Sequence, residues 1–174
     1  MMDDAAVVAV QIGRPLRSST DVVVRCHLGL PVVTRVPPLL DDGTPFPTTF
    51  WLSCPLATRR IGRIEAAGGV KAMERRAGAD PEFGAELEAA HARYRSDREA
   101  LLPDNAERVP SGGVAGARTG VKCLHAHYAD HAAGNQNPVG AVTAPWVEPL
   151  DCATGCVVEV GSGVESNSRW VEPR

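Results

Sequence analysis

Residues 48–69, TTFWLSCPLATRRIGRIEAAGG, contain the point at which the chain is predicted to change from strand to helix. The beginning of this stretch is rich in aromatic and β-branched side chains, which are typical of strands. From Pro55 onward apolar residues recur at helical spacing until a glycine pair ends the pattern. We therefore predict a strand that ends at Cys54 and a helix that begins directly after it.

The segments before this point predict further strands. Residues 21–26 (DVVVRC) are predicted to form a buried strand, and residues 32–36 (VVTRV) a second one. Residues 3–12 favour a short helix capped by Asp4, although their valines also permit a strand. We expect the strands to form a small antiparallel sheet.

Helices are predicted to dominate the middle of the chain. Residues 70–79 indicate a short helix. The clearest helix covers residues 80–102, because Asp80 is a good N-cap and Pro81 fits the first helical position. Its predicted apolar face consists of Phe83, Leu87, Ala90, Tyr94 and Leu101.

A further helix is predicted from about Gly120 to Gly134, after a long polar loop, and residues 135–140 (NQNPVG) are predicted to form a turn. The resulting fold class is α+β, with a small antiparallel sheet from the N-terminal third packed against three to four helices. We expect a single α+β domain over residues 1–145 and a partly ordered C-terminal extension over residues 146–174.

The composition of the 174-residue chain is ordinary for a globular protein, with 44% apolar and 22% charged residues. Its net charge of −3 gives no general attraction to nucleic acid or anionic membranes, although Arg14 and Arg17 could form a local basic patch. No apolar run approaches the roughly 20 residues of a membrane helix. The first residues also lack the basic start of a signal peptide. We therefore expect a cytoplasmic protein with no nucleic-acid partner and no membrane insertion.

Metal-ligating side chains are concentrated in residues 121–140, VKCLHAHYADHAAGNQNPVG. If this segment is helical, Cys123, His127 and His131 lie on one face. If it is extended, Cys123, His125 and His127 share a face instead. Either arrangement supplies two ligands to one metal ion, so the other ligands would have to come from elsewhere in the chain.

The other cysteines provide these candidate ligands, because cytoplasmic cysteines are more often free, metal-bound or redox-active than paired in disulfides. Cys54 precedes a predicted helix, whose N-terminus lowers the pKa of a thiol. Cys152 and Cys156 have the spacing C-x3-C, which is close to that of a metal-binding pair. The predicted metal ligands are Cys26, Cys54, Cys123 and one of the two histidines His125 and His127.

Zinc fits three thiolates and an imidazole, and an iron–sulfur cluster is the alternative cofactor. The C-terminal cysteine pair could complete this site or form a second one. Two other interpretations stay open. The cysteines could simply fill the core, or Cys54 could act as a nucleophile with a histidine from CLHAH and with Asp130.

Other motifs give weaker signals. SGGVAG, residues 111–116, lacks the strand and the lysine of a phosphate loop, but it could form an anion-binding nest with Arg118 or Lys122. Asp41, Asp42 and Glu65 belong to no obvious paired-carboxylate motif, so we interpret them as turn and surface residues.

Several segments together resemble one protein family. In chain order they are QIGRPLR, RCHLGLPVV, DGTPFPTTFWLSCP, IGRIEAAG and VKCLHAHYADHAAGNQNPVG. Over roughly residues 8–145 the chain is similar to the bacterial family known as domain of unknown function 501. The resemblance implies a bacterial cytosolic protein whose genes commonly lie beside those for a septum-formation initiator and an exopolyphosphatase-type enzyme. This association implies a link to cell division or polyphosphate physiology, with a division protein as the possible partner, and it supplies no catalytic residues.

Three functional hypotheses follow. The first is a small metal-binding protein with a structural or regulatory role. The second is an enzyme of hydrolase type that uses a metal-bound water or a Cys-His pair. The third is a non-catalytic interaction module in which the cysteines are core residues. Whether the protein is an enzyme is left open by the sequence.

Overall fold

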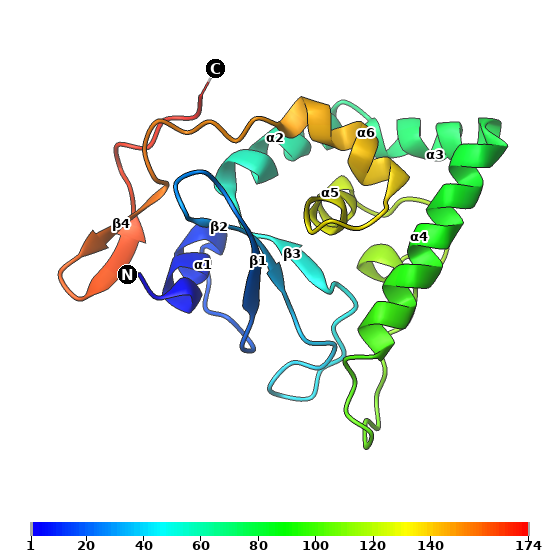
Figure 1. Ribbon diagram of the computed structural model, residues 1–174, viewed down its shortest axis with the longest axis horizontal. Helices are drawn as coiled ribbons and strands as arrows, with labels where there is room; N and C mark the ends of the chain where they lie inside the picture. The colour runs from blue at the N-terminus through cyan, green and yellow to red at the C-terminus, as the bar shows by residue number, and fades with distance from the viewer. Residues whose placement is uncertain (1, 174) are drawn as a thin grey trace.

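The change from strand to helix at Pro55 is present in the computed structural model, which describes residues 2–173. The described chain combines small antiparallel sheets with α-helices, so the α+β prediction is confirmed (Figure 1). In chain order the elements are α1 (Asp4–Ile12), β1 (Asp21–Arg25), β2 (Pro31–Arg35), β3 (Phe50–Leu52), α2 (Pro55–Ala66), α3 (Gly69–Ala79), α4 (Pro81–Glu99), the 3-10 helix η1 (Val114–Gly116), α5 (Leu124–Ala132), α6 (Pro138–Val147), β4 (Val157–Val160) and β5 (Gly163–Ser166).

The N-terminal sheet has the strand order β1-β2-β3, and both strand pairs are antiparallel. The central strand β2 is buried over residues 31–34. Strand β1 instead alternates between exposed and partly exposed residues, so the prediction of a buried strand over residues 21–26 is wrong. The reason is that β1 lies at the edge of the sheet, where fewer elements cover it.

Helix α1 is confirmed, but its cap differs from the prediction by one residue. The side chain of Asp3 accepts a hydrogen bond from the backbone N–H of Ala6 at 3.0 Å and is therefore the N-cap. Asp4 forms an ion pair with Arg25 of β1 instead. Gly13 ends the helix in the left-handed conformation, with φ of 69°.

Helix α5 occupies the centre of the molecule, between the sheet and α4 (Figure 1). It contacts β3, α2 and α6, and most of its residues are buried. Helix α6 approaches it closely at Gly140, where a Cβ atom would lie 2.4 Å from the carbonyl oxygen of His127. A residue larger than glycine at this position would therefore force the two helices apart.

The sequence prediction missed α6. Asn137 is the N-cap of this helix and Pro138 is its first residue, whereas residues 135–140 were predicted as a turn alone. Because α6 continues to Val147, the predicted boundary between residues 145 and 146 falls inside a helix. Beyond it, β4 and β5 form an antiparallel hairpin that packs against α1 (Figure 1).

Helix α4 begins as predicted, with Asp80 as its N-cap and Pro81 in the first turn. At the C-terminal end of α4, the buried face differs from the predicted one. Leu101 lies beyond the helix and is 42% exposed, whereas Arg98 is fully buried. The hydroxyl group of Tyr94 accepts the backbone N–H of Thr49 at 2.7 Å, which attaches α4 to the start of β3.

The loop that precedes α5 is folded around the buried guanidinium group of Arg98. Its Nη1 atom donates to the carbonyls of Pro47 and Gly113, and its Nη2 atom donates to those of Pro110 and Gly112. Residues 110–113 thus present carbonyl oxygens to a cation. They do not present N–H groups to an anion, as the predicted nest would require.

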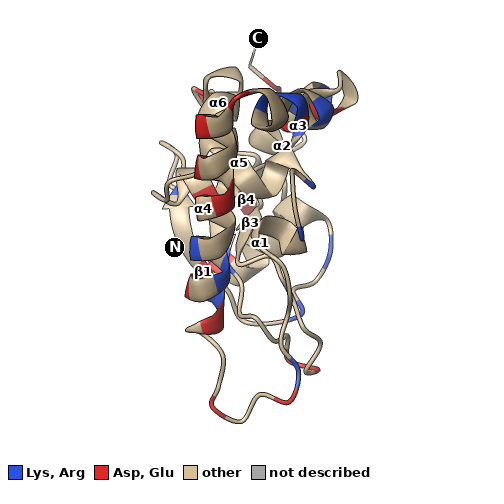
Figure 2. Cartoon of the chain, turned by 90° about the vertical axis from the view of Figure 1, so that its right-hand side faces the viewer, with Lys and Arg blue, Asp and Glu red and all other residues tan. Residues whose placement is uncertain are grey.

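Charged residues of both signs are interspersed along α4, and basic residues are prominent on α3 (Figure 2). This mixture agrees with the small net charge of the sequence. In the described part of the chain, no helix combines the length and apolar character needed to cross a membrane.

Arg98 gives a direct test of this fold. In Arg98→Lys the charge is retained, but lysine lacks the planar fork of donors that reaches four carbonyls. We expect the free energy of unfolding, measured by urea denaturation, to fall by about 2–4 kcal/mol. The matched control is Arg95→Lys on the exposed side of α4, which should change it by less than about 0.5 kcal/mol. Equal losses in the two variants would show that the loop does not depend on Arg98.

Candidate functional site

Cys123 is positioned by the start of α5. It is the N-cap residue, with an extended backbone (φ −161°, ψ 131°), and its Sγ atom accepts the backbone N–H of Ala126 at 3.4 Å. Because the helix begins only at Leu124, Cys123 does not continue the helical face of His127 and His131. The structure pairs it with His125 and Glu65 instead, so neither the helical nor the extended grouping predicted from the sequence is formed.

Glu65 meets this thiol from the C-terminal end of α2. Its Oε1 atom accepts the backbone N–H of Leu124 at 2.6 Å and lies 3.2 Å from Nδ1 of His125. Glu65 was interpreted from the sequence as a surface residue, yet its side chain is only 27% exposed. It joins the end of α2 to the start of α5.

His125 is fixed by both of its ring nitrogens. Nε2 lies 3.2 Å from the carbonyl oxygen of Thr58, which can only accept, so Nε2 carries a hydrogen. Nδ1 therefore faces Glu65 either as a protonated donor or as a free lone pair. Hydrogen bonding to Cys123, and then the charge of Glu65, raises the pKa of His125 to about 9 against the opposing effect of burial.

Glu65, Cys123 and His125, called here the Glu65 group, bring together three different ligand atoms. One carboxylate oxygen, one sulfur and one imidazole nitrogen all lie within 4.8 Å of one another. In residues 2–173 this is the one set of three such side chains that meets this distance. Since His125 is 28% exposed, the group can be reached from solvent.

His127 lies elsewhere, in a polar network inside the protein. It has no exposed surface, and its Nδ1 atom is 3.0 Å from Oδ1 of Asn137. Asn137 in turn donates to Asp130, which pairs with Arg93 of α4. Burial lowers the pKa of His127 to about 4, so the ring is neutral at physiological pH. These contacts favour a structural role for His127.

Cys26 and Cys54 lie in a third place, in a small pocket that also contains Cys152 and Cys156. Cys54 is the N-cap of α2, as the sequence indicated. Burial nevertheless raises the pKa of its thiol to about 11, and this outweighs the lowering by the N–H groups of Ala57 and Leu56. The expectation of an activated thiol at Cys54 is therefore wrong.

The five predicted metal ligands are thus distributed over three positions. Cys123 and His125 meet at the Glu65 group, Cys26 and Cys54 line the cysteine pocket, and His127 belongs to the buried network. The sequence pattern missed Glu65, because its partners lie almost sixty residues away in the chain. The only local signal was a carboxylate in the last turn of a helix, where the helix dipole does not favour it.

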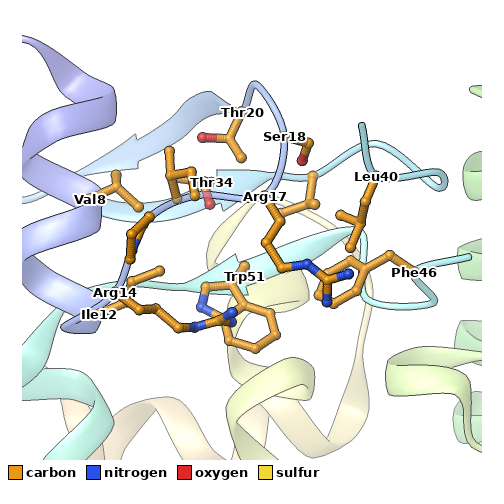
Figure 3. Close-up of a pocket in the computed structure, with 13 residues that line it drawn as sticks. Val8, Ile12, Arg14, Arg17, Ser18, Thr20, Thr34, Leu40, Phe46 and Trp51 are labelled. Carbon is orange, nitrogen blue, oxygen red and sulfur yellow. The ribbon is translucent and has the colours of Figure 1, made fainter. Parts of the chain in front are cut away.

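A larger pocket of about 130 Å³ lies between α1 and the sheet (Figure 3). Here the guanidinium group of Arg14 lies 5.5 Å from the ring centre of Trp51, within cation–π range. Arg17, the other residue of the predicted basic patch, is paired with Asp42 at 2.8 Å. The lining contains no cysteine, histidine or carboxylate, so this pocket adds no metal ligands.

The fold and the site define a small α+β protein with a candidate metal-binding group at the junction of two helices. The chain belongs to the family described as protein of unknown function (DUF501), whose sequence model matches residues 22–145. The resemblance predicted from the sequence is confirmed at the level of the family. The chain has no significant match among the curated proteins or among the solved structures.

The buried imidazole of His127 predicts a loss of stability in acid. The unfolded chain takes up a proton below a pKa of about 6.5, whereas folded His127 does so only near 4, so protons favour the unfolded state between these values. Lowering the pH from about 7.5 to about 5 should therefore reduce the free energy of unfolding by about 2 kcal/mol through this histidine. His127→Gln should lack this part of the loss, and His131→Gln should retain it. Parallel pH profiles for wild type and His127→Gln would contradict the assignment.

Proposed function

We propose that this protein binds a divalent metal ion through Glu65, Cys123 and His125, with zinc as the best fit. The observation that carries the proposal is the convergence of three ligand atoms within 4.8 Å from two helices. Zinc is bound in proteins by this combination of sulfur, imidazole nitrogen and carboxylate oxygen.

The surroundings of the three side chains support this assignment. A metal-bound histidine usually donates its second ring N–H to a backbone carbonyl, which is the contact that His125 makes with Thr58. The sulfur of Cys123 receives the N–H of Ala126, and the carboxylate of Glu65 receives that of Leu124. These contacts limit the rotation of each ligand before a metal arrives, which lowers the entropic cost of binding.

Three protein ligands leave one position of a tetrahedral zinc ion for water, which is the ligand number of catalytic zinc sites. This number favours the hydrolase form of the hypothesis, in which the metal-bound water is the nucleophile. The division-protein partner and the link to polyphosphate physiology rest on the family resemblance alone. We retain them as proposals secondary to the metal site.

Zinc titration of reduced, metal-stripped protein by calorimetry tests the site. Cys123→Ser and His125→Gln each remove one of three ligands, so the affinity of this site should fall by roughly 100-fold or more. Glu65→Gln should weaken it as well. His131→Gln lies on the same helix and leaves the group intact, so it should bind zinc as wild type does. Unchanged zinc binding in both Cys123→Ser and His125→Gln would refute the proposal.

A second candidate function, thiol chemistry, is favoured by the contact between Cys123 and His125. Cys123 is the partly exposed N-cap of α5 and lies beside an imidazole that can carry a positive charge. This geometry moves the Cys-His hypothesis from Cys54, whose thiol is buried, to Cys123.

Alkylation separates this candidate from metal binding. In metal-free protein at neutral pH, iodoacetamide should label Cys123 faster than a free-cysteine peptide, and His125→Gln should slow the reaction. Cys54 provides the internal comparison and should react slowly, because burial raises its pKa. Labelling of Cys123 no faster than the peptide would exclude an activated thiol and leave the metal proposal untouched.

A further inference from the structure

Four of the five cysteines line one small pocket beside the N-terminus of α2. They are Cys26, Cys54, Cys152 and Cys156, and the volume of the pocket is about 20 Å³. Cys26 lies at the turn between β1 and β2, where its N–H donates to the carbonyl of Leu30. Cys54 lies at the start of α2, and Cys152 and Cys156 lie in the chain that follows α6. Segments far apart in the sequence therefore deliver their thiols to one place.

Two side-chain N–H groups point at the sulfur atoms of this pocket. Nε1 of Trp170 donates to Sγ of Cys152 at 3.3 Å, and Nε2 of Gln11 donates to Sγ of Cys156 at 3.6 Å. Neutral thiols are weak acceptors, whereas metal-bound thiolates commonly receive such N–H···S bonds. The two donors therefore suit sulfur atoms that carry negative charge.

A purely structural role explains only part of this arrangement. Cys54 is buried and packs in the main hydrophobic core, but Cys26, Cys152 and Cys156 are only partly buried. Residues 149–156 form no helix or strand, so holding them in place costs conformational entropy that no backbone ladder offsets. A cross-link between this segment and the domain would offset that cost.

The separations of the sulfur atoms bear on the kind of centre. Among the described residues, no three of these four sulfurs all lie within 4.8 Å of one another. Tetrahedral zinc with Zn–S bonds of about 2.3 Å needs sulfur atoms roughly 3.8 Å apart, so the four side chains would have to move closer together to bind a single ion. An iron–sulfur cluster places several irons between its ligands and accepts wider spacing.

We propose that Cys26, Cys54, Cys152 and Cys156 bind a thiophilic metal centre through four thiolates, either one zinc ion or an iron–sulfur cluster. Each thiol releases its proton to solvent when its sulfur binds the metal. The centre attaches the C-terminal extension to the sheet and to α2. It shares no residue with the Glu65 group, so the two proposals stand or fall separately.

Metal analysis of anaerobically purified full-length protein, with an absorption spectrum, tests this centre. The double variant Cys152→Ser/Cys156→Ser should lose the metal completely from this site. Cys123→Ser is the matched control, because it alters the Glu65 group and should keep the four-thiolate metal. Colourless zinc retained by Cys123→Ser identifies a single ion in this centre, and iron with sulfide and a broad visible band identifies a cluster. Either result supports the proposal.

Two results would overturn it. One is equal metal content in the double variant and the wild type. The other is a wild-type protein that holds no zinc or iron beyond the metal lost in Cys123→Ser, even after anaerobic reconstitution with Zn²⁺ or with iron and sulfide.

Limited proteolysis keeps the test valid if the double variant folds poorly. Removing the metal from wild type with a chelator should speed cleavage within residues 149–170, while residues 21–145 stay resistant. Cleavage of this segment at the same rate with and without chelator would contradict the proposed cross-link.

Discussion

A fully buried carboxylate on α5 determines how the neighbouring helices are arranged. Asp130 has no exposed surface and receives hydrogen bonds from Arg93 of α4, from Asn135, and from Asn137 at the start of α6. A buried charge is tolerated only when it is paired and hydrogen-bonded, so these partners must stay in place. Because Cys123 is the N-cap of α5 and α6 leads into the C-terminal extension, this network positions parts of both candidate metal sites.

Helix-capping signals in the local sequence predicted the start of a helix correctly where they were recognised as caps. The pair Asp80–Pro81 predicted the start of α4 because a capping side chain precedes a proline that suits the first helical turn. Asn137–Pro138 is the same signal, yet it was interpreted as a turn because asparagine, glycine and proline surround it. The burial of β1 could not be predicted in this way, since its place at the sheet edge depends on how the whole chain folds.

The composition of the candidate sites depends on contacts between distant parts of the chain more strongly than the positions of the helices do. Cys54 and Cys123 are both helix N-caps in the structure, but the sequence indicated this position only for Cys54, because the helix that contains Cys123 was predicted to begin near Gly120. Burial raises the pKa of Cys54, whereas Cys123 lies beside His125 and Glu65 at a partly exposed junction. The sequence therefore named Cys123 and His125 among its candidates, but it could not predict which of the candidates meet. That grouping is set by packing between segments far apart in the chain.

Helix α2 connects the two candidate centres without allowing them to share one ion. Cys54 caps its first turn and Glu65 lies in its last, which at about 1.5 Å per residue separates them by roughly 16 Å along the axis. This distance is several times the length of a metal–ligand bond, so Cys54 and Cys123 lie too far apart to ligate one ion while α2 is helical. A metal bound at either end would still favour the folded helix on which the other site depends. The two proposed centres therefore depend on the same helix, although they would have no ligand in common.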